Sequence, residues 1–374
     1  MRKSRFLSRV FISAFIAASF ASAAQAAPQP NGTCTPPGGV WSTRAPYTNT
    51  ISRAWGAFYP PDGKFYLMGG RPDDVAGDDF IQVHIYDPAS DTWAESNATF
   101  TDNQNNNMVG GVLDFGGQQL IVTVGGSAAG GTTSSSNTQT YDPVGDSLQL
   151  LASDPWPGNT DGAILPGGAA VYENKLFVFG GFDIGIGMVD TIWQFDPAAA
   201  DGSRWTQMTA TLPTPIGYIP TTVSNGLIYL MGGSTWDDVN LTILDSAESS
   251  IYDPDADTIS AAPMPIPRAT AETRAVTQPD GTIWVLGGGR DAPNPSNEVD
   301  VYDPVGNQWT IGPAFTAPRR NFSSDTDPAT GNVWAVGGYD VDGVTLLSIN
   351  EQFTGCNEIL DRIFADGFDG PPPP

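Results

Sequence analysis

The stretch that decides the fold is residues 283–309, where IWVLGG (283–288) is followed by VYDP (301–304) and then Trp309. An apolar run ending in Gly-Gly indicates a buried strand that stops where a side chain would obstruct its neighbour. The Asp-Pro step sets a type I turn, so the apolar segments beside it form an antiparallel hairpin. One such unit therefore predicts a small antiparallel sheet.

The Gly-Gly pair occurs six times, with spacings of 56, 55, 52, 55 and 50 residues. The pairs stand at 69–70, 125–126, 180–181, 232–233, 287–288 and 337–338. An aromatic residue followed by Asp-Pro comes after each of the first five pairs, and the sixth unit keeps only the aromatic Phe353. Four short strands per unit, repeated without a helical period, predict a radial array of sheets.

These units resemble the kelch repeat, whose motif couples a Gly-Gly pair to a downstream Tyr-Asp and a Trp. The resemblance covers about residues 33–356 and implies an all-β fold, a six-bladed kelch β-propeller. The second and fourth units depart from the motif, because Leu148 and Ile259 stand where the Trp is expected.

The two ends of the repeat region complement each other. Trp41 has the context of an outermost strand but no Gly-Gly upstream, while the sixth unit stops after Phe353. We expect the N-terminal strand to complete the last blade and close the ring. Cys34 and Cys356 flank the two strands concerned, and they are the chain's two cysteines, so we predict a disulfide between them. Two free or metal-binding thiols are the alternative.

The segments outside the repeats have patterns of their own. Residues 1–26 carry a basic start, a short apolar stretch and a small-x-small site ending at Ala26, which predicts a secretory signal peptide and a secreted, periplasmic or cell-surface protein. A membrane-spanning helix is the alternative for this segment. Residues 27–356 are assigned to the propeller. Residues 357–374 form a tail ending in four prolines, either a sorting tag or a frayed terminus.

The charge of the chain limits the classes of partner that it can bind. The 374 residues include 41 acidic and 16 basic side chains, a formal charge of −25, which becomes −29 without the four basic residues of the first segment. Such a chain repels polyanions, so nucleic acid and anionic membrane surfaces are excluded as partners. We expect a monomer with no further membrane span.

The connections predict which end of the propeller binds. Turns between first and second strands are short, as at 61–63 and 279–281, whereas stretches such as 71–79, 127–137, 234–248 and 260–273 are long. Long loops on a rigid scaffold are where binding sites concentrate. We expect ligand-binding residues among the arginines and aromatics there: Arg53, Arg268, Arg274, Arg319, Arg320, Tyr218 and Trp236. Guanidinium groups would suit a carboxylate or an anionic sugar, unless they pair with nearby acids instead.

The number of histidines limits the kinds of catalytic site that the chain can form. Kelch-like copper oxidases such as galactose oxidase need two His ligands, and His84 is the only histidine, so copper-radical oxidation is excluded. His84 is interpreted as structural. We expect no cofactor and no metal site, with calcium in the acidic loops as the alternative.

The functional prediction is a binding or interaction module for a protein or glycan. Secreted kelch propellers include the bacterial N-acetylneuraminate epimerases, which implies a carbohydrate isomerase or lyase as the alternative. Its candidate residues would be Glu248, Glu272, Arg268 and Arg274. A purely structural role in an envelope is the third hypothesis.

Overall fold

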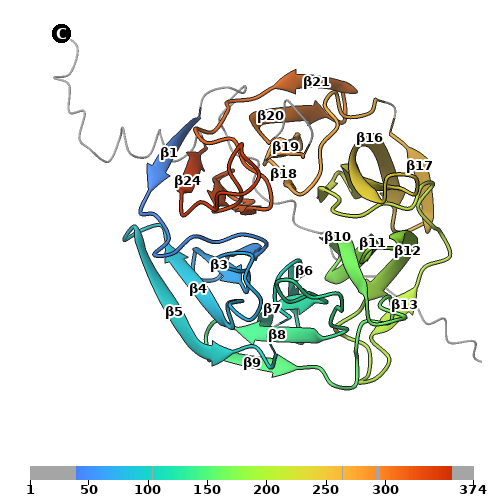
Figure 1. Cartoon of the computed structure of the whole chain (residues 1–374), viewed down its shortest axis with the longest axis horizontal. Helices are drawn as coiled ribbons and strands as arrows, with labels where there is room; N and C mark the ends of the chain where they lie inside the picture. The colour runs from blue at the N-terminus through green and yellow to red at the C-terminus, as the bar shows by residue number, and fades with distance from the viewer. Residues whose placement is uncertain (1–38, 103, 263, 291–294, 356–374) are drawn as a thin grey trace, which may run out of the picture. The chain divides into compact units, whose positions relative to one another are not determined.

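The computed structural model describes residues 39–102, 104–262, 264–290 and 295–355. Their strands form six four-stranded antiparallel sheets, which are arranged as blades around a central channel (Figure 1). Blades 1 to 5 are the sheets β2–β5, β6–β9, β10–β13, β14–β17 and β18–β21, each in chain order from the channel outward. Blade 6 has the order β22-β23-β24-β1. The all-β six-bladed propeller is therefore confirmed.

The strands are short except in blades 3 and 4. Those of blades 1 to 3 are β2 (Trp55–Tyr59), β3 (Lys64–Met68), β4 (Gln82–Asp87), β5 (Thr92–Thr99), β6 (Val109–Asp114), β7 (Gln119–Val124), β8 (Thr138–Asp142), β9 (Ser147–Leu150), β10 (Ile164–Tyr172), β11 (Lys175–Asp183), β12 (Gly187–Phe195) and β13 (Trp205–Gln207). Those of blades 4 to 6 are β14 (Thr221–Ser224), β15 (Leu227–Asp237), β16 (Thr242–Asp253), β17 (Thr258–Ala261), β18 (Arg274–Thr277), β19 (Ile283–Gly288), β20 (Ser296–Asp303), β21 (Gln308–Ile311), β22 (Ser323–Thr326), β23 (Val333–Val336), β24 (Asn350–Thr354) and β1 (Val40–Arg44).

Blade 6 joins the two ends of the repeat region. β1 pairs antiparallel with β24, with Val40 opposite Thr354 and Trp41 opposite Phe353. The indole of Trp41 packs against Phe353 at a centroid distance of 5.7 Å and donates a 2.7 Å hydrogen bond to the carbonyl of Pro313 in the neighbouring blade. The outermost strand of the last blade thus comes from the N-terminal side, as the sequence predicts. Cys34 and Cys356 lie outside the described residues, so their disulfide stays a prediction.

The Gly-Gly pairs stand where blades approach each other closely. Gly69 and Gly70 have φ angles of +64° and +91°, in the left-handed region that side chains disfavour. A Cβ on Gly69 would lie far inside van der Waals distance of the Asn105 carbonyl oxygen, on the connection into blade 2. The sequence requires glycine there for space and for backbone conformation together.

The Tyr-Asp-Pro turn carries a hydrogen-bonded latch between neighbouring blades. In blade 2 the buried Tyr141 hydroxyl donates to Asp146 over 2.9 Å, and Asp146 accepts a 3.0 Å bond from the backbone of Asn97 in β5 of blade 1. Tyr86 with Asp91 and Tyr252 with Asp257 repeat the arrangement. The Asp residue ends the turn with positive φ, +46° at Asp146. The same latch therefore closes the outer hairpin and ties it to the preceding blade.

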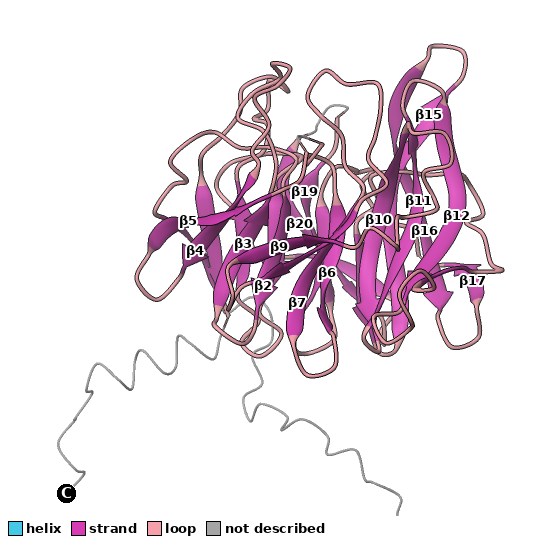
Figure 2. Ribbon diagram, turned by 90° about the horizontal axis from the view of Figure 1, so that it is seen from below, coloured by secondary structure: helices cyan, strands magenta, loops and turns pink. Residues whose placement is uncertain are grey.

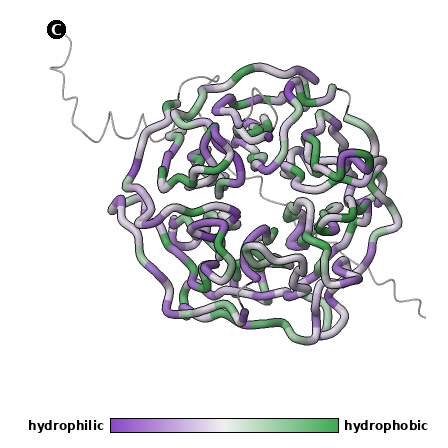
Figure 3. Tube along the Cα trace, in the orientation of Figure 1, coloured by the Kyte–Doolittle hydropathy of each residue, from purple (hydrophilic) through white to green (hydrophobic). Residues whose placement is uncertain are grey.

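The hydrophobic core is divided among the interfaces between blades. At one of them Phe179 of β11 contacts Tyr252 of β16 edge-on at a centroid distance of 5.4 Å, with Ile228 of β15 in the same cluster. Figure 3 shows hydrophobic segments in all six blades rather than in one region. Each blade can bury both faces only when two neighbours are present, which is why the ring is the folding unit.

One long stretch differs from its expected form. Residues 234–248 do not make an irregular loop, because β15 and β16 continue as paired strands as far as Asp237 and Thr242. Figure 2 shows β15 extending beyond the other strands at one end of the propeller. The alternation in Ser234-Thr235-Trp236 favours strand pairing, and a tight turn at 238–241 closes the hairpin. Within the described ranges no helix is long and apolar enough to cross a bilayer.

Candidate functional site

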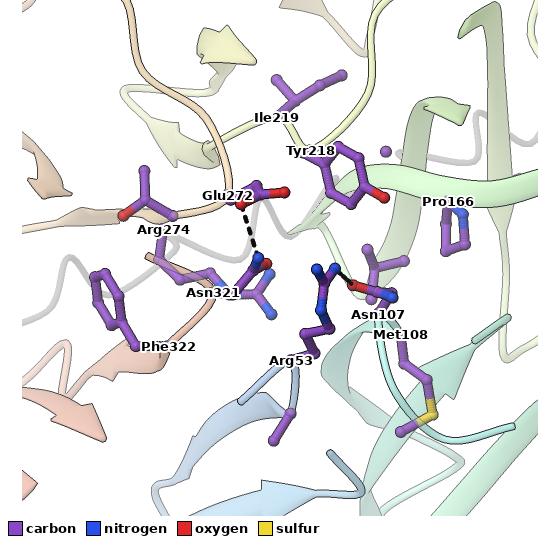
Figure 4. Close-up of a pocket in the computed structure, with 14 residues that line it drawn as sticks. Arg53, Asn107, Met108, Pro166, Tyr218, Ile219, Glu272, Arg274, Asn321 and Phe322 are labelled. Atoms are coloured by element: carbon purple, nitrogen blue, oxygen red, sulfur yellow. Dashed lines mark hydrogen bonds between the residues drawn. The ribbon is translucent and has the colours of Figure 1, made fainter. Parts of the chain in front are cut away.

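Five blades each place one residue at the same end of the channel, directly before or within three residues of the innermost strand. These residues share a left-handed backbone: Arg53 (φ 58°), Asn107 (φ 58°), Tyr218 (φ 50°), Glu272 (φ 54°) and Asn321 (φ 52°). Their side chains line one pocket of about 50 Å³, which we call the mouth pocket (Figure 4). It lies at the end that carries the connections between second and third strands, which we call the long-connection end.

Backbone hydrogen bonds join these residues from blade to blade. The amide of Asn107 donates to the carbonyl of Arg53 over 2.9 Å, and the amide of Arg53 donates to Asn321 over 2.8 Å. The amide of Asn321 donates to the carbonyl of Glu272 over 2.6 Å, and the amide of Glu272 donates to the carbonyl of Tyr218 over 3.3 Å. The unusual φ angles are the geometry that this ring of hydrogen bonds requires, and they turn the five side chains toward the channel axis.

Blade 3 interrupts this ring. Its contribution to the mouth pocket is Pro166 and Gly167, and proline has no amide hydrogen to donate. The amide of Ile219 bonds instead to the carbonyl of Gly167 over 2.8 Å. The mouth pocket therefore has one side without a functional side chain, between Asn107 and Tyr218.

Glu272 is the charge centre of the mouth pocket. Its buried carboxylate accepts hydrogen bonds from Arg290 over 2.8 Å and from Asn321 over 2.8 Å, and it forms an ion pair with Arg320. Burial alone would raise the pKa of Glu272, but the charges of Arg290, Arg320 and Arg53 outweigh it and lower the pKa to about 2. Glu272 is therefore a fixed anion at neutral pH.

Arg53 presents a positive charge without an ion pair among the described residues. Its guanidinium donates to the side-chain oxygen of Asn107 over 3.0 Å (Figure 4). It also lies over the ring of Tyr339, at 5.6 Å from the ring centroid. Burial lowers the pKa of Arg53, but the charge of Glu272 more than compensates and the pKa stays raised. Arg53 can therefore accept an additional anionic partner.

Arg274 stands deeper, where the mouth pocket adjoins the channel below it. Its half-buried side chain lines both spaces, and it is not a member of the ion pairs found within the described part of the chain. Burial lowers its pKa to about 10, and the negative charge of Asp325 offsets part of that effect. A half-buried guanidinium that faces a cavity and has no ion pair among the described residues is a candidate for ligand binding.

Two of the arginines expected at the site lie in ion pairs away from the mouth pocket. Arg268 donates to Asp300 over 2.8 Å and to the carbonyl of Gly287 over 3.0 Å. Arg319 is fully buried, forms an ion pair with Glu351 and lies over the ring of Phe315 at 5.2 Å. For these two residues the pairing with acids that the sequence left open is the arrangement found.

The remaining expected residues lie at or beside the mouth pocket. Arg320, paired with Glu272, lies over the ring of Tyr339 at 4.8 Å, and Tyr218 lines the pocket itself. Trp236 does not line it, but Phe182 contacts both Tyr218 and Trp236 at centroid distances of 5.9 Å. These three aromatic side chains form a strip that runs from the mouth pocket to the projecting hairpin of blade 4.

Asn107 and Asn321 were not among the residues expected at the site. Each precedes its Gly-Gly pair by 16 to 18 residues, as Arg53, Tyr218 and Glu272 do by 14 to 16, so alignment of the six units on Gly-Gly is the signal that locates them. The four residues named for an isomerase do not converge. Glu272 and Arg274 line the mouth pocket, Arg268 does not, and Glu248 lines another cavity of about 10 Å³.

The acidic side chains and His84 make no cluster of the kind that holds a metal. No group of three or more His, Cys, Asp or Glu side chains with that geometry occurs in the part of the chain that the structure describes. His84 is buried beside Tyr47, whose hydroxyl lies 3.0 Å from its Nδ1, and burial lowers its pKa to about 4.

Comparison with known proteins supports the architecture. A kelch motif matches residues 273–316. The chain is 31% identical over 123 residues to Beta-scruin of Limulus polyphemus, a match that covers 32% of this chain and only 13% of that protein. The solved structure of YjhT is similar with a TM-score of 0.62 and 14% identity, over 84% of this chain and 98% of that one. At that identity the likeness establishes the fold alone.

The six-bladed ring and the pocket at its channel mouth define a β-propeller with one elaborated end. The fold is that of a six-bladed β-propeller, and residues 273–316 of its fifth blade match the kelch motif.

Proposed function

We propose that this propeller binds an exported partner, a protein or a glycan, at its long-connection end and takes a carboxylate of that partner into the mouth pocket. The observation that carries this proposal is the guanidinium of Arg53, which has no ion pair among the described residues although the chain carries a formal charge of −25. In a chain with so many acids, a positive group at the mouth without an acidic partner suits recognition of an anion.

The local charge supports an anionic ligand. The charges of Arg53, Arg290 and Arg320 act on the single carboxylate of Glu272, and Arg274 also lines the pocket. This gives the mouth a formal excess of three positive charges. Pockets with low-dielectric walls focus such a field, so an acidic group is drawn to the mouth while the outer surface repels anions.

A protein is the first candidate partner because apolar side chains are exposed around this end. They sit at the tips of the connections of blades 1, 3, 4 and 6: Val75, Ile186, Val239, Leu241, Val341 and Val344. Exposed aliphatic groups gathered around a pocket are typical of protein docking surfaces. An acidic side chain or a C-terminal carboxylate would enter the pocket.

A glycan is the second candidate, favoured by the aromatic strip of Tyr218, Phe182 and Trp236. Rings at the edge of an anion-binding pocket could stack on a sugar that carries its carboxylate to Arg53. The alternative of an isomerase or lyase fits less well, because a general base needs a pKa near the working pH and Glu272 is held at about 2.

The experiment measures binding with matched variants. Sialic acid, uronates, neutral sugars and short acidic peptides are titrated by calorimetry into the wild type, Arg53→Gln and Lys175→Gln. Lys175 lies at the other end of blade 3, so it controls for the change in net charge. We expect a carboxylate ligand to bind the wild type and Lys175→Gln equally, and Arg53→Gln at least tenfold more weakly.

Equal binding by Arg53→Gln, or equal binding of neutral and acidic forms of one ligand, would contradict the proposal. Export is tested separately on the native protein. The N-terminal sequence of material recovered outside the cytoplasm should begin just after Ala26, and its mass before and after reduction should differ by two hydrogens if Cys34 and Cys356 are joined. An intact residue 1 would overturn the export prediction.

A further inference from the structure

A second cavity fills the channel beneath Arg274. It has a volume of about 360 Å³ and lies between the innermost strands of all six blades. One end reaches Arg274, and the other reaches Pro60 and Pro328, in the turns that follow β2 and β22. We call it the channel cavity, and its lower opening is at the end opposite the mouth pocket.

The wall of the channel cavity mixes aliphatic and hydroxyl groups. Half-buried Val112, Val171 and Val223 come from β6, β10 and β14, and Phe58 contributes from β2. Each innermost strand has one edge without a neighbouring strand. Side chains of the next blade form hydrogen bonds with some of the unpaired backbone groups along that edge. The hydroxyl of Thr277, for example, donates to the carbonyl of Val223 over 2.7 Å. The wall is therefore partly apolar and needs few additional hydrogen bonds.

The two charged groups that line the channel cavity, Asp325 and Arg274, differ in whether they already have hydrogen-bond partners. Both carboxylate oxygens of Asp325 are in use, one accepting from the amide of Phe58 over 2.7 Å and the other from the amide of Thr326 over 2.8 Å. Arg274 has no such partner among the described residues, and Asp325 is not within ion-pair distance of it. Of the two groups, the guanidinium of Arg274 is therefore the one that can bind a ligand, and that ligand would be an anion.

We propose that the channel cavity is a separate site for a small monocarboxylic acid with an apolar body. The carboxylate would bind the guanidinium of Arg274, and the body would lie against Val112, Val171 and Val223. A single guanidinium matches one carboxylate in a bidentate arrangement. The nearby carboxyl of Asp325 disfavours a dianion such as a dicarboxylate or a phosphate.

The charged groups around Arg274 also predict how the affinity for a carboxylate ligand changes with pH. Burial raises the pKa of Asp325 to about 6, while the amides of Phe58 and Thr326 and the charge of Arg274 act in the opposite direction. Asp327 faces Asp325 and raises its pKa, and Glu272 and Arg53 lie above Arg274 in the mouth pocket. A carboxylate ligand therefore meets less repulsion at pH 5.5 than at pH 7.5, and its own carboxyl is still mostly ionised at the lower pH.

The test uses hexanoate and benzoate as probes, with hexanol and adipate as controls, on the whole chain. We expect both monocarboxylates to bind, hexanol and adipate to bind at least tenfold more weakly, and the affinity for hexanoate to be at least twofold higher at pH 5.5. Arg274→Gln should weaken hexanoate at least tenfold, whereas Arg53→Gln should leave it unchanged. Wild-type protein that binds no probe, or Arg274→Gln that binds hexanoate as well as wild type, overturns the proposal.

A second variant separates this site from the mouth pocket. Val223→Phe fills the channel cavity below Arg274 without touching the mouth, so it should abolish hexanoate binding and leave a mouth ligand unaffected. If this variant does not fold, methyl NMR of the wild type decides. Hexanoate should shift the methyl signals of Val112 and Val171 and spare Met108, which lines the mouth pocket. Shifts confined to Met108 would contradict the channel site while leaving the proposed function standing.

Discussion

Arg319 and Arg320 are adjacent in the chain, yet their guanidinium groups bind carboxylates on different blades. Arg319 turns inward to Glu351 in β24 of its own blade, and Arg320 crosses to Glu272, which precedes the innermost strand of blade 5. The first pair is completely buried, whereas Arg320 keeps part of its side chain at the surface of the mouth. One arginine thus stabilises the blade and its neighbour organises the pocket.

The contrast predicts unequal costs for the same substitution. Arg319→Met leaves Glu351 buried without its cation and should lower the free energy of unfolding by about 3–5 kcal/mol. Arg320→Met should lower it by about 1 kcal/mol, because Glu272 retains Arg290 and Asn321. Urea denaturation of both variants measures the difference. Equal losses would show that the Arg319 pair is not the more deeply coupled one.

Arg274 should behave in the opposite way from Arg319. Its half-buried guanidinium makes no ion pair among the described residues, so Arg274→Met removes a partial desolvation cost and breaks no described contact. We expect the free energy of unfolding to stay within about 0.5 kcal/mol of wild type or to rise. The measurement is denaturant unfolding without ligand. A loss of 2 kcal/mol or more, on the order of a broken buried pair, would reveal a structural role for Arg274.

Glu272 predicts a specific acid sensitivity. Its pKa, about 2, lies below the 4.5 of the unfolded chain, so its stabilising effect is complete above pH 4.5 and is lost as pH falls toward 2. Glu272→Gln should cost a few kcal/mol at pH 7, or roughly 3 kcal/mol from the pKa difference. The gap between wild type and variant should narrow from pH 5 downward, as followed by denaturation at stepped pH. A gap that does not change with pH would contradict the ionised state of Glu272.

Asp146 combines a hydrogen-bond role with a backbone role, and two variants separate them. Asp146→Ala loses the bonds from Tyr141 and Asn97 and also places alanine at φ +46°, so a loss of about 2–3 kcal/mol is expected. Asp146→Gly loses the same bonds but tolerates the φ angle, so it should be about 1 kcal/mol more stable than the alanine variant. Thermal and urea unfolding test the order. If Asp146→Ala were at least as stable as Asp146→Gly, backbone strain at this position would be excluded as a cause of the loss.

The Gly-Gly signature predicts a large difference between two glycines of blade 1. Gly69→Ala places a methyl group against the Asn105 carbonyl at φ +64°, and should cost about 3 kcal/mol or prevent folding. Gly63 has a similar φ of +70°, but nothing lies within 4 Å of its Cβ position, so Gly63→Ala should cost about 1 kcal/mol. Comparable costs for the two variants would mean that close packing is not the reason for the pair.

The candidate site was only partly predictable from sequence. Arg53 was expected at the long-connection end because it precedes an innermost strand, and Tyr218 because it lies near the long loops; both line the mouth pocket. Arg268 and Arg319 also precede innermost strands, but they lie a few residues earlier, where the chain still passes between blades and acids are within reach. Asn107 and Asn321 carry no charge and so gave no chemical signal, although the backbone ring gives them the same position as Glu272.

The sequence by itself determined the six blades, their strand order and the closing of the ring, because each repeat encodes these features locally. The Gly-Gly pair, the aromatic residue and the Asp-Pro turn act over a few residues and are visible in each of the first five units. Only the tertiary structure decided which arginines are paired and which are not. Glu272 meets Arg320 across 48 residues and Arg290 across 18, and such distances in sequence become contacts only when the blades stand around a common axis. Charge pairing depends on that arrangement, so the sites follow from the ring rather than from the repeat.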